Sequence, residues 1–115
     1  MDPFDIPLFQ NVYDFYKTLY LCLKDFPRQD RYSLGQRCEV LTIELLQSIA
    51  IAGRLLKLQK APYLEKASTT VDLLRVALRL AKDVHALDMK KYVTLQAAVD
   101  AIGRMLGGWR RSVLA

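Results

Sequence analysis

The residues best suited to chemistry in this chain are one histidine and a set of arginines and lysines. His85 is the sole histidine among 115 residues, and five residues separate it from Arg79. An imidazole can transfer protons near neutral pH, and a guanidinium can hold phosphate oxygens, so this pair could support phosphodiester cleavage. The sequence contains no nucleophilic-serine turn, zinc-protease motif or phosphate-binding loop. Arg79 and His85 are therefore its one catalytic candidate.

The spacing of Arg79 and His85 is similar to that in the helical ribonucleases of the HEPN superfamily. In those enzymes the arginine supports phosphate charge and the histidine performs acid–base chemistry. On a continuous helix, however, positions i and i+6 lie about 120° apart around the axis. The alternative is a partly exposed His85 near a helix end, where its protonated form suits the helix dipole. We predict a protein that is not an enzyme and has no cofactor or metal site, and we keep a ribonuclease as an alternative.

A surplus of positive charge is the second chemical feature. The chain has 17 Lys and Arg against 12 Asp and Glu, which gives a formal net charge of +5. Residues 1–57 contain seven basic and seven acidic side chains, whereas residues 58–115 contain ten and five. The whole excess therefore lies in the second half. A local concentration of cations attracts polyanions, so nucleic acid is a candidate partner.

Six basic side chains of the second half are candidates for contacting phosphates or a partner protein: Arg75, Arg79, Lys82, Arg104, Arg110 and Arg111. The first three follow i, i+4, i+7 spacing and would form one column on a helix. Asp72, Asp83 and Asp100 lie three or four residues from arginines of this set, so they could neutralise them. Arg110 and Arg111 have no such acid nearby, although cations are ordinary near a helix end. Phosphate binding and ion pairing remain alternatives.

Apolar residues recur at helical spacing through almost the whole chain. The pattern predicts four helices, at about residues 7–24, 34–58, 62–86 and 89–109, with Arg110 to Ala115 frayed. No segment alternates for long enough to indicate a strand. Short connectors make neighbouring helices antiparallel, so we predict a single all-α domain over residues 1–115. Its architecture would be an up-down-up-down four-helix bundle.

Helix start and stop signals agree with these ranges. The residue before Pro27 is disfavoured in a helix, which ends the first segment. Ser33 and Gln36 have the spacing of a capping box for the second. Pro62 suits a first helical position and Asp88 suits an N-cap.

The sequence features that bear on localisation favour the cytoplasm. The acidic amino-terminal residues do not resemble a secretory signal. The longest uncharged run, residues 45–53, has nine residues, and a membrane-spanning helix needs about 20. Cys22 and Cys38 have no metal-ligand spacing and fall on apolar helix faces, so we expect buried, reduced thiols.

The third helix has a second apolar stripe in addition to its core seam. The stripe consists of Leu73, Val76, Ala77, Leu80, Val84 and Leu87. One bundle core needs an apolar arc of about 100° or somewhat more, so the surplus must face something else. A wide core and a subunit interface are the alternatives, and we assign Leu73, Val76, Leu80 and Val84 to an oligomer interface. Further apolar residues support it: Leu8, Phe15 and Leu21 in the first helix and Val40, Ile43 and Ile51 in the second.

Two further features have structural interpretations. The aromatic residues Phe9, Tyr13, Phe15, Tyr16 and Tyr20 are expected mostly in the core by their spacing. A base-stacking surface would require exposed rings on a groove, which the spacing does not indicate. The glycines of Gly103-x-x-x-Gly107-Gly108 are expected to let a second helix approach closely.

Four sequence blocks carry a resemblance to a known family: Phe26-Pro27 followed by Tyr32-Ser33-Leu34-Gly35, then Leu78-Arg79-Leu80-Ala81-Lys82-Asp83, then Leu87 to Tyr92, and Ile102-Gly103-Arg104-Met105-Leu106-Gly107-Gly108-Trp109. In this order they resemble the family of the accessory variability determinant (Avd) protein of diversity-generating retroelements. Proteins encoded in intervening sequences of bacterial ribosomal RNA genes belong to the same family. The resemblance covers nearly the whole chain, and the last block is the most specific.

This resemblance implies a ring-like homopentamer with a basic surface. It implies binding to a retroelement reverse transcriptase and to template RNA, and to DNA as a further candidate, in support of mutagenic copying. The matching blocks assign the basic-surface role to Arg79, Lys82 and Arg104, and by extension to Arg75, Arg110 and Arg111. The intervening-sequence branch and a purely structural bundle remain alternatives.

Overall fold

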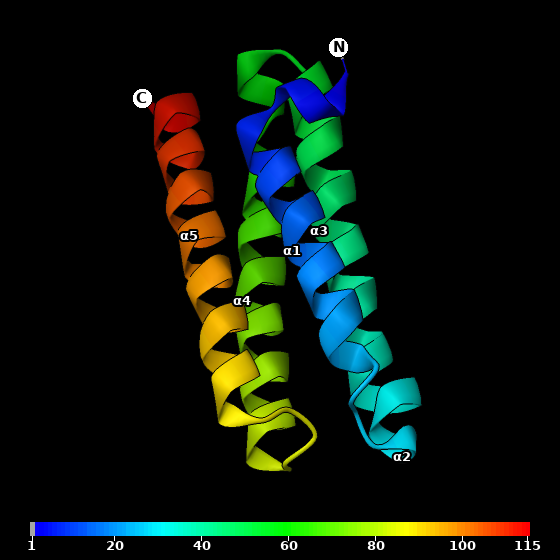
Figure 1. Cartoon of the computed structure of the whole chain (residues 1–115). Coiled ribbons are helices and arrows are strands. Elements are labelled where there is room, and N and C mark those ends of the chain that lie inside the picture. The colour runs from blue at the N-terminus through cyan, green and yellow to red at the C-terminus, as the bar shows by residue number, and fades with distance from the viewer. Residues whose placement is uncertain (1) are drawn as a thin grey trace.

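Four long helices make up the computed structural model, which describes residues 2–115 (Figure 1). They are α1 (Pro7–Leu23), α3 (Gln36–Arg54), α4 (Ala61–Asp83) and α5 (Met89–Leu114). The short elements are two 3-10 turns (Pro3–Asp5 and Lys57–Gln59), α2 (Arg28–Asp30) and a π-helical segment (Arg31–Gly35). Residues 2–115 contain no strand, which confirms the all-helical prediction.

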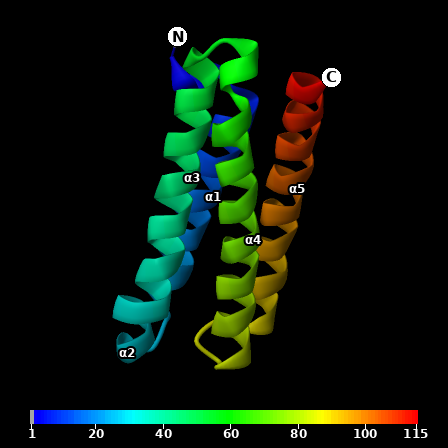
Figure 2. The same cartoon turned by 180° about the vertical axis from the view of Figure 1, so that it is seen from behind.

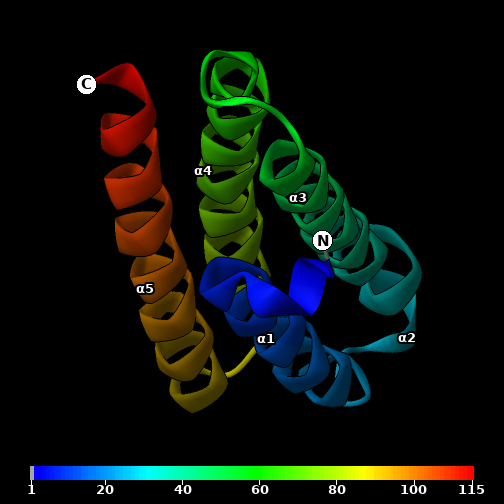
Figure 3. The same cartoon turned by 90° about the horizontal axis from the view of Figure 1, so that it is seen from above.

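The four long helices pack in two layers around one core. α3 and α4 lie together in front when the molecule is viewed from behind, and α1 lies behind them (Figure 2). Backbone contacts join α1 to α3 and α5, and join α4 to α3 and α5. Seen from above, α3, α4 and α5 surround α1 on three sides (Figure 3). The molecule is elongated along the helices, with extents of 44 × 23 × 19 Å.

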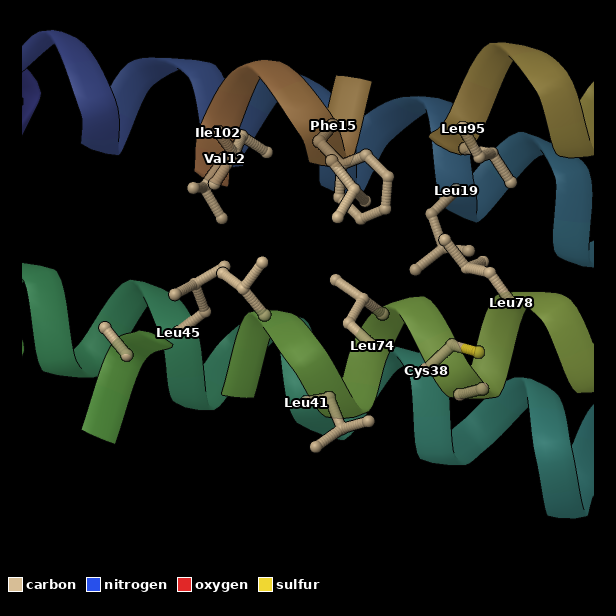
Figure 4. Close-up of a cluster of buried hydrophobic side chains, with 14 of the residues drawn as sticks. Val12, Phe15, Leu19, Cys38, Leu41, Leu45, Leu74, Leu78, Leu95 and Ile102 are labelled. Carbon is tan, nitrogen blue, oxygen red and sulfur yellow. The ribbon is translucent and has the colours of Figure 1, made fainter. Parts of the chain in front are cut away.

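Branched aliphatic side chains fill the space between the two layers (Figure 4). Leu19, Leu45 and Leu78 are completely buried there, and each comes from a different helix. The core is wider on α1 than the sequence indicated. Leu8 and Phe15, predicted as surplus apolar residues, are 4% and 3% exposed and belong to the core. Of the three proposed surplus residues on α1, Leu21 alone faces outward.

The boundary between α1 and α3 differs from the prediction. Helical backbone resumes directly after Pro27 and continues through Gly35 into α3. The Ser33 hydroxyl donates to the Gln29 carbonyl oxygen at 3.0 Å, so Ser33 lies inside a helical turn and caps nothing. The predicted capping box was therefore wrong, because Pro27 already supplies the extended residue that precedes the helix. α3 also ends at Arg54, four residues earlier than predicted.

A left-handed residue ends α4. His85 has φ 63°, and no other non-glycine residue among residues 2–115 has a positive φ. The Ala86 N–H donates to the Ala81 carbonyl at 2.9 Å and the His85 N–H donates to that of Lys82 at 3.0 Å. These two bonds form a Schellman motif, which normally places glycine where His85 stands. The motif ends the helix at Asp83, earlier than the predicted 86.

We predict that His85→Gly stabilises the protein by about 1 kcal/mol, because glycine adopts the left-handed conformation without a Cβ clash. Urea unfolding followed by circular dichroism measures the change. His85→Ala is the control, since alanine keeps the clash and should remain near the parent. Equal stability of the glycine and alanine variants would contradict the strain at this position.

α5 begins as predicted and ends later. The Asp88 carboxylate accepts the Lys91 N–H at 2.8 Å, which confirms Asp88 as the N-cap. The predicted fraying after Trp109 was wrong, because α5 continues to Leu114. Val113 is only 5% exposed, and burial of its side chain holds the last turn against the bundle. None of the helices among residues 2–115 is long and apolar enough to cross a membrane.

Both cysteines are free and buried, as predicted. Cys38 is inaccessible, and burial raises the pKa of its thiol to about 11. Burial also raises the pKa of the Cys22 thiol. Because the thiolate is the reactive form, both side chains should resist modification.

We therefore expect a disulfide reagent at pH 8 to modify the folded protein at least about 100-fold more slowly than the protein in urea. The absorbance of the released thiolate measures both rates and counts the modified thiols. Two thiols that react promptly in the native state would show that the α1–α3 contact opens frequently.

Candidate nucleic-acid and partner interface

All six basic candidates lie on α4 and α5, two helices in direct contact. The core faces of these helices, set by buried residues such as Leu74 and Leu95, leave the six basic residues outside the core, on the outer edge of this helix pair. We call this edge the α4–α5 seam. The structure divides the six into three that link the helices and three that extend outward.

Arg75 links the two helices at the middle of the seam. Its Nε lies 3.3 Å from Oδ1 of Asp100 on α5, and its Nη1 lies 3.3 Å from Oδ1 of Asp72. Gly103 leaves room for the guanidinium, since a Cβ built there would lie 2.6 Å from Nη2 of Arg75. With two carboxylates beside it, Arg75 has little charge left for a phosphate.

Lys82 and Arg110 make the other two links. The Lys82 ammonium lies 4.9 Å from the ring centroid of Tyr92 on α5, and 3.3 Å from a carboxylate oxygen of Asp83. Arg110 forms an ion pair with Glu65 of α4, so it is compensated across the helices. Sequence spacing missed this pair because the two residues are 45 positions apart.

Arg79, Arg104 and Arg111 extend outward, and we call them the outward arginines. Arg79 is 73% exposed, and its nearest carboxylate contact, to Asp83, is 3.9 Å long. Within residues 2–115 neither Arg104 nor Arg111 forms an ion pair. Arg104 lacks one because Asp100, four residues before it, pairs with Arg75 across the seam. Arg104 and Arg111 are two helical turns apart, or about 10 Å.

The predicted interface residues lie on the other flank of α4. Leu73, Val76, Leu80 and Val84 are exposed by 46%, 64%, 49% and 50%. Their mean direction lies about 140° around the axis from that of the three α4 cations, at 100° per residue. On α3, Val40, Ile43 and Ile51 are also exposed. We call these seven residues the α3–α4 apolar face, while Ala77 and Leu87 of the predicted stripe belong to the core.

The catalytic candidate is divided by the helix end. His85 borders a pocket of about 510 Å³ whose other polar side chains are Lys82, Asp83 and Asp88, and Arg79 does not line it. Arg79 lies within the helix, whereas His85 lies beyond the cap. Among residues 2–115 no group of three His, Cys, Asp or Glu side chains could hold a metal ion.

Two further sequence interpretations, one on α1 and one on α5, were wrong. Tyr13 and Tyr20 are 39% and 52% exposed, not buried in the core. A lysine four positions after each tyrosine was the signal that could have revealed this, because cations commonly lie over exposed aromatic rings. The glycines Gly107 and Gly108 meet no second helix: a Cβ at either would approach only the guanidinium of Arg111.

Comparisons with known proteins give one clear result. The family model described as bAvd-like matches residues 8–113. The comparison with curated proteins returned no match. The matched range covers all four long helices apart from the first residue of α1 and the last of α5, so the chain belongs to the bAvd-like family.

Proposed function

We propose that this chain is a non-enzymatic accessory protein of a diversity-generating retroelement. It binds the reverse transcriptase and the template RNA, or its DNA copy, and supports mutagenic reverse transcription. Family membership supports the accessory role, since the bAvd-like match spans residues 8–113. The proposed partners are an enzyme and a nucleic acid, and the cytoplasm is the compartment where the protein would meet them.

The exposure of the three outward arginines is the observation that supports binding to a nucleic acid. Arg104 and Arg111 form no ion pair within residues 2–115, and Arg79 is exposed with one long contact of 3.9 Å to Asp83. Arg75, Lys82 and Arg110 hold together the two helices that present them. An exposed guanidinium that is unpaired, or only loosely paired, within the chain can bind a phosphate backbone and release its counterions. We therefore narrow the binding role from six residues to the outward three.

Assembly multiplies this charge. We propose that the α3–α4 apolar face packs against other copies of the chain to form a homopentamer, the assembly that the family resemblance implies. A homopentamer of chains that each carry +5 would bear +25. Because phosphate contacts add and salt dependence steepens with their number, repeated weak sites become one strong polyanion-binding particle.

Fluorescence anisotropy with a labelled template-repeat RNA, titrated from about 50 to 300 mM salt, tests the nucleic-acid part. We expect binding whose logarithm falls linearly with the logarithm of salt concentration. Co-purification of a tagged chain with the reverse transcriptase tests the protein part. The absence of RNA binding even at the lowest salt would overturn the nucleic-acid role. RNA binding without any capture of the reverse transcriptase would instead favour the intervening-sequence branch.

A further inference from the structure

A second pocket is formed by residues 20–39, outside the α4–α5 seam. It has a volume of about 390 Å³ and occupies the corner where α1 ends and α3 begins. Tyr20 and Tyr32 supply its aromatic surface, Lys24 and Arg31 supply positive charge, and Gln36 and Glu39 supply hydrogen-bonding groups. Pockets of about 300–1,000 Å³ are typical of small-ligand sites.

Local backbone structure builds this corner. Pro27 starts a new helical run, and residues 31–35 adopt π-helical geometry, which is frequent at functional sites. Gly35 allows the run to press against the end of α1: a Cβ there would lie 2.9 Å from Cδ2 of Leu23. The Arg31 guanidinium donates from Nη2 to the Lys24 carbonyl at 2.7 Å, which ties the two sides together.

Both tyrosines of the pocket are accessible to solvent. Tyr20 is 52% exposed and Tyr32 is 67% exposed. The Lys24 ammonium lies 5.3 Å from the Tyr20 ring centroid, and Lys24 forms no ion pair within residues 2–115. Aromatic rings beside a cation are the combination that stacks a nucleobase and holds its phosphate.

The remaining polar groups suit the edge of a base. One Glu39 carboxylate oxygen accepts the Tyr16 hydroxyl at 3.0 Å, which orients the carboxylate and leaves its other oxygen as an acceptor. The Gln36 side chain is exposed and can both donate and accept. Arg31 bonds through Nη2, and its buried Nε has no hydrogen-bond partner within residues 2–115.

We infer that this corner binds one nucleotide unit, with the base stacked on Tyr20 and Tyr32 and the phosphate beside Lys24 and Arg31. The unit is an unstacked residue of a single-stranded nucleic acid or a free nucleotide. The inference goes beyond the proposed function because it concerns different helices and a different chemistry. Stacking recognises a base, whereas the outward arginines can recognise a backbone without bases.

Helix α1 also contains a matched control for the Tyr20 and Lys24 pair. Tyr13 and Lys17 repeat the pair, with the ammonium 5.1 Å from the ring centroid. Here, however, Asp14 lies 3.3 Å from the lysine, and the Phe4 ring packs edge-on with its centroid 5.0 Å from that of Tyr13. Tyr13 therefore has the exposed tyrosine and the lysine but lacks the pocket and the free charge.

Binding of three fluorescent probes tests the inference: a twelve-residue oligoadenylate, a twelve-residue abasic deoxyribose-phosphate strand, and AMP. For Tyr20→Ala with Tyr32→Ala we expect about 5- to 100-fold weaker binding of the oligoadenylate and unchanged binding of the abasic strand. Tyr13→Ala should bind both strands like the parent. Tyr20-dependent binding of AMP as tight as that of the oligoadenylate would identify a free nucleotide as the source, and much weaker AMP binding would identify a strand.

Two outcomes would overturn the inference. The first is oligoadenylate binding that the double tyrosine variant leaves unchanged. The second is an equal loss for both strands in a variant whose circular dichroism matches the parent. The outward arginines separate this test from the proposed function, because Arg104→Glu with Arg111→Glu should weaken both strands together. If the arginine variant binds both strands like the parent while the tyrosine variant loses oligoadenylate binding, the proposed basic interface is refuted and the nucleotide pocket is supported.

Discussion

Val76→Glu combined with Leu80→Glu is expected to abolish the proposed homopentamer and leave a 13.2 kDa monomer that remains helical. Both side chains are about half exposed or more in the single chain and contribute little to its own core. At a subunit contact, by contrast, each substitution buries an unpaired carboxylate, which costs several kcal/mol per site. Light scattering coupled to size exclusion measures the mass, and circular dichroism measures the helix content.

Val93→Glu is the matched control for the interface variant. Val93 is 57% exposed on α5, outside the α3–α4 apolar face, so its substitution should leave the mass unchanged. A parent protein that is already monomeric at high concentration would refute the oligomer. An assembly of any size that survives the double substitution would refute the assignment of the α3–α4 apolar face as the subunit interface.

Arg104→Glu combined with Arg111→Glu is expected to weaken binding of template RNA by about 10- to 100-fold at about 0.15 M salt. Within residues 2–115 neither guanidinium has an ion pair, so reversal removes phosphate contacts without breaking an internal link. The slope of log affinity against log salt should become shallower by about 0.7–0.9 for each phosphate that the particle no longer neutralises. Anisotropy titrations at several salt concentrations measure both quantities.

The control variant must change the net charge by the same amount at a different place on the surface. Arg37 and Arg54 are exposed on α3 and form no ion pair within residues 2–115, so their double reversal has the same effect on net charge. We expect it to weaken RNA binding less than the α5 variant does. An equal effect of the two double variants would show that net charge, and not the α4–α5 seam, governs binding. Light scattering must confirm that both variants keep the mass of the parent.

The two predictions are linked through assembly. If the pentamer concentrates weak phosphate contacts, the Val76 and Leu80 double variant should also bind RNA more weakly, although its outward arginines are intact. Its salt slope should then approach that of one subunit. A monomer that binds as tightly as the assembly would show that one chain forms the complete site.

Local sequence determined the helices of this protein because the information needed is local. Apolar residues at 3.6-residue spacing predicted four helices and most of the core, and Asp88 predicted the start of α5. Errors arose where a contact from another helix, or an unusual backbone conformation, decided the outcome. Burial of Val113 extends α5 past its predicted end, and a left-handed His85 ends α4, where sequence signals favour glycine.

The basic candidate site likewise depends partly on local sequence and partly on contacts between helices. Residue types and positions placed six cations on two helices, and sequence spacing paired Asp100 with Arg104. Only the tertiary structure decided that Asp100 pairs with Arg75 and Glu65 with Arg110, because these partners lie on different helices. Ion pairing falls off with distance in space, not with separation along the chain. For that reason sequence alone determined how much positive charge the protein has, and the packing of α4 on α5 decided which arginines remain free to use it.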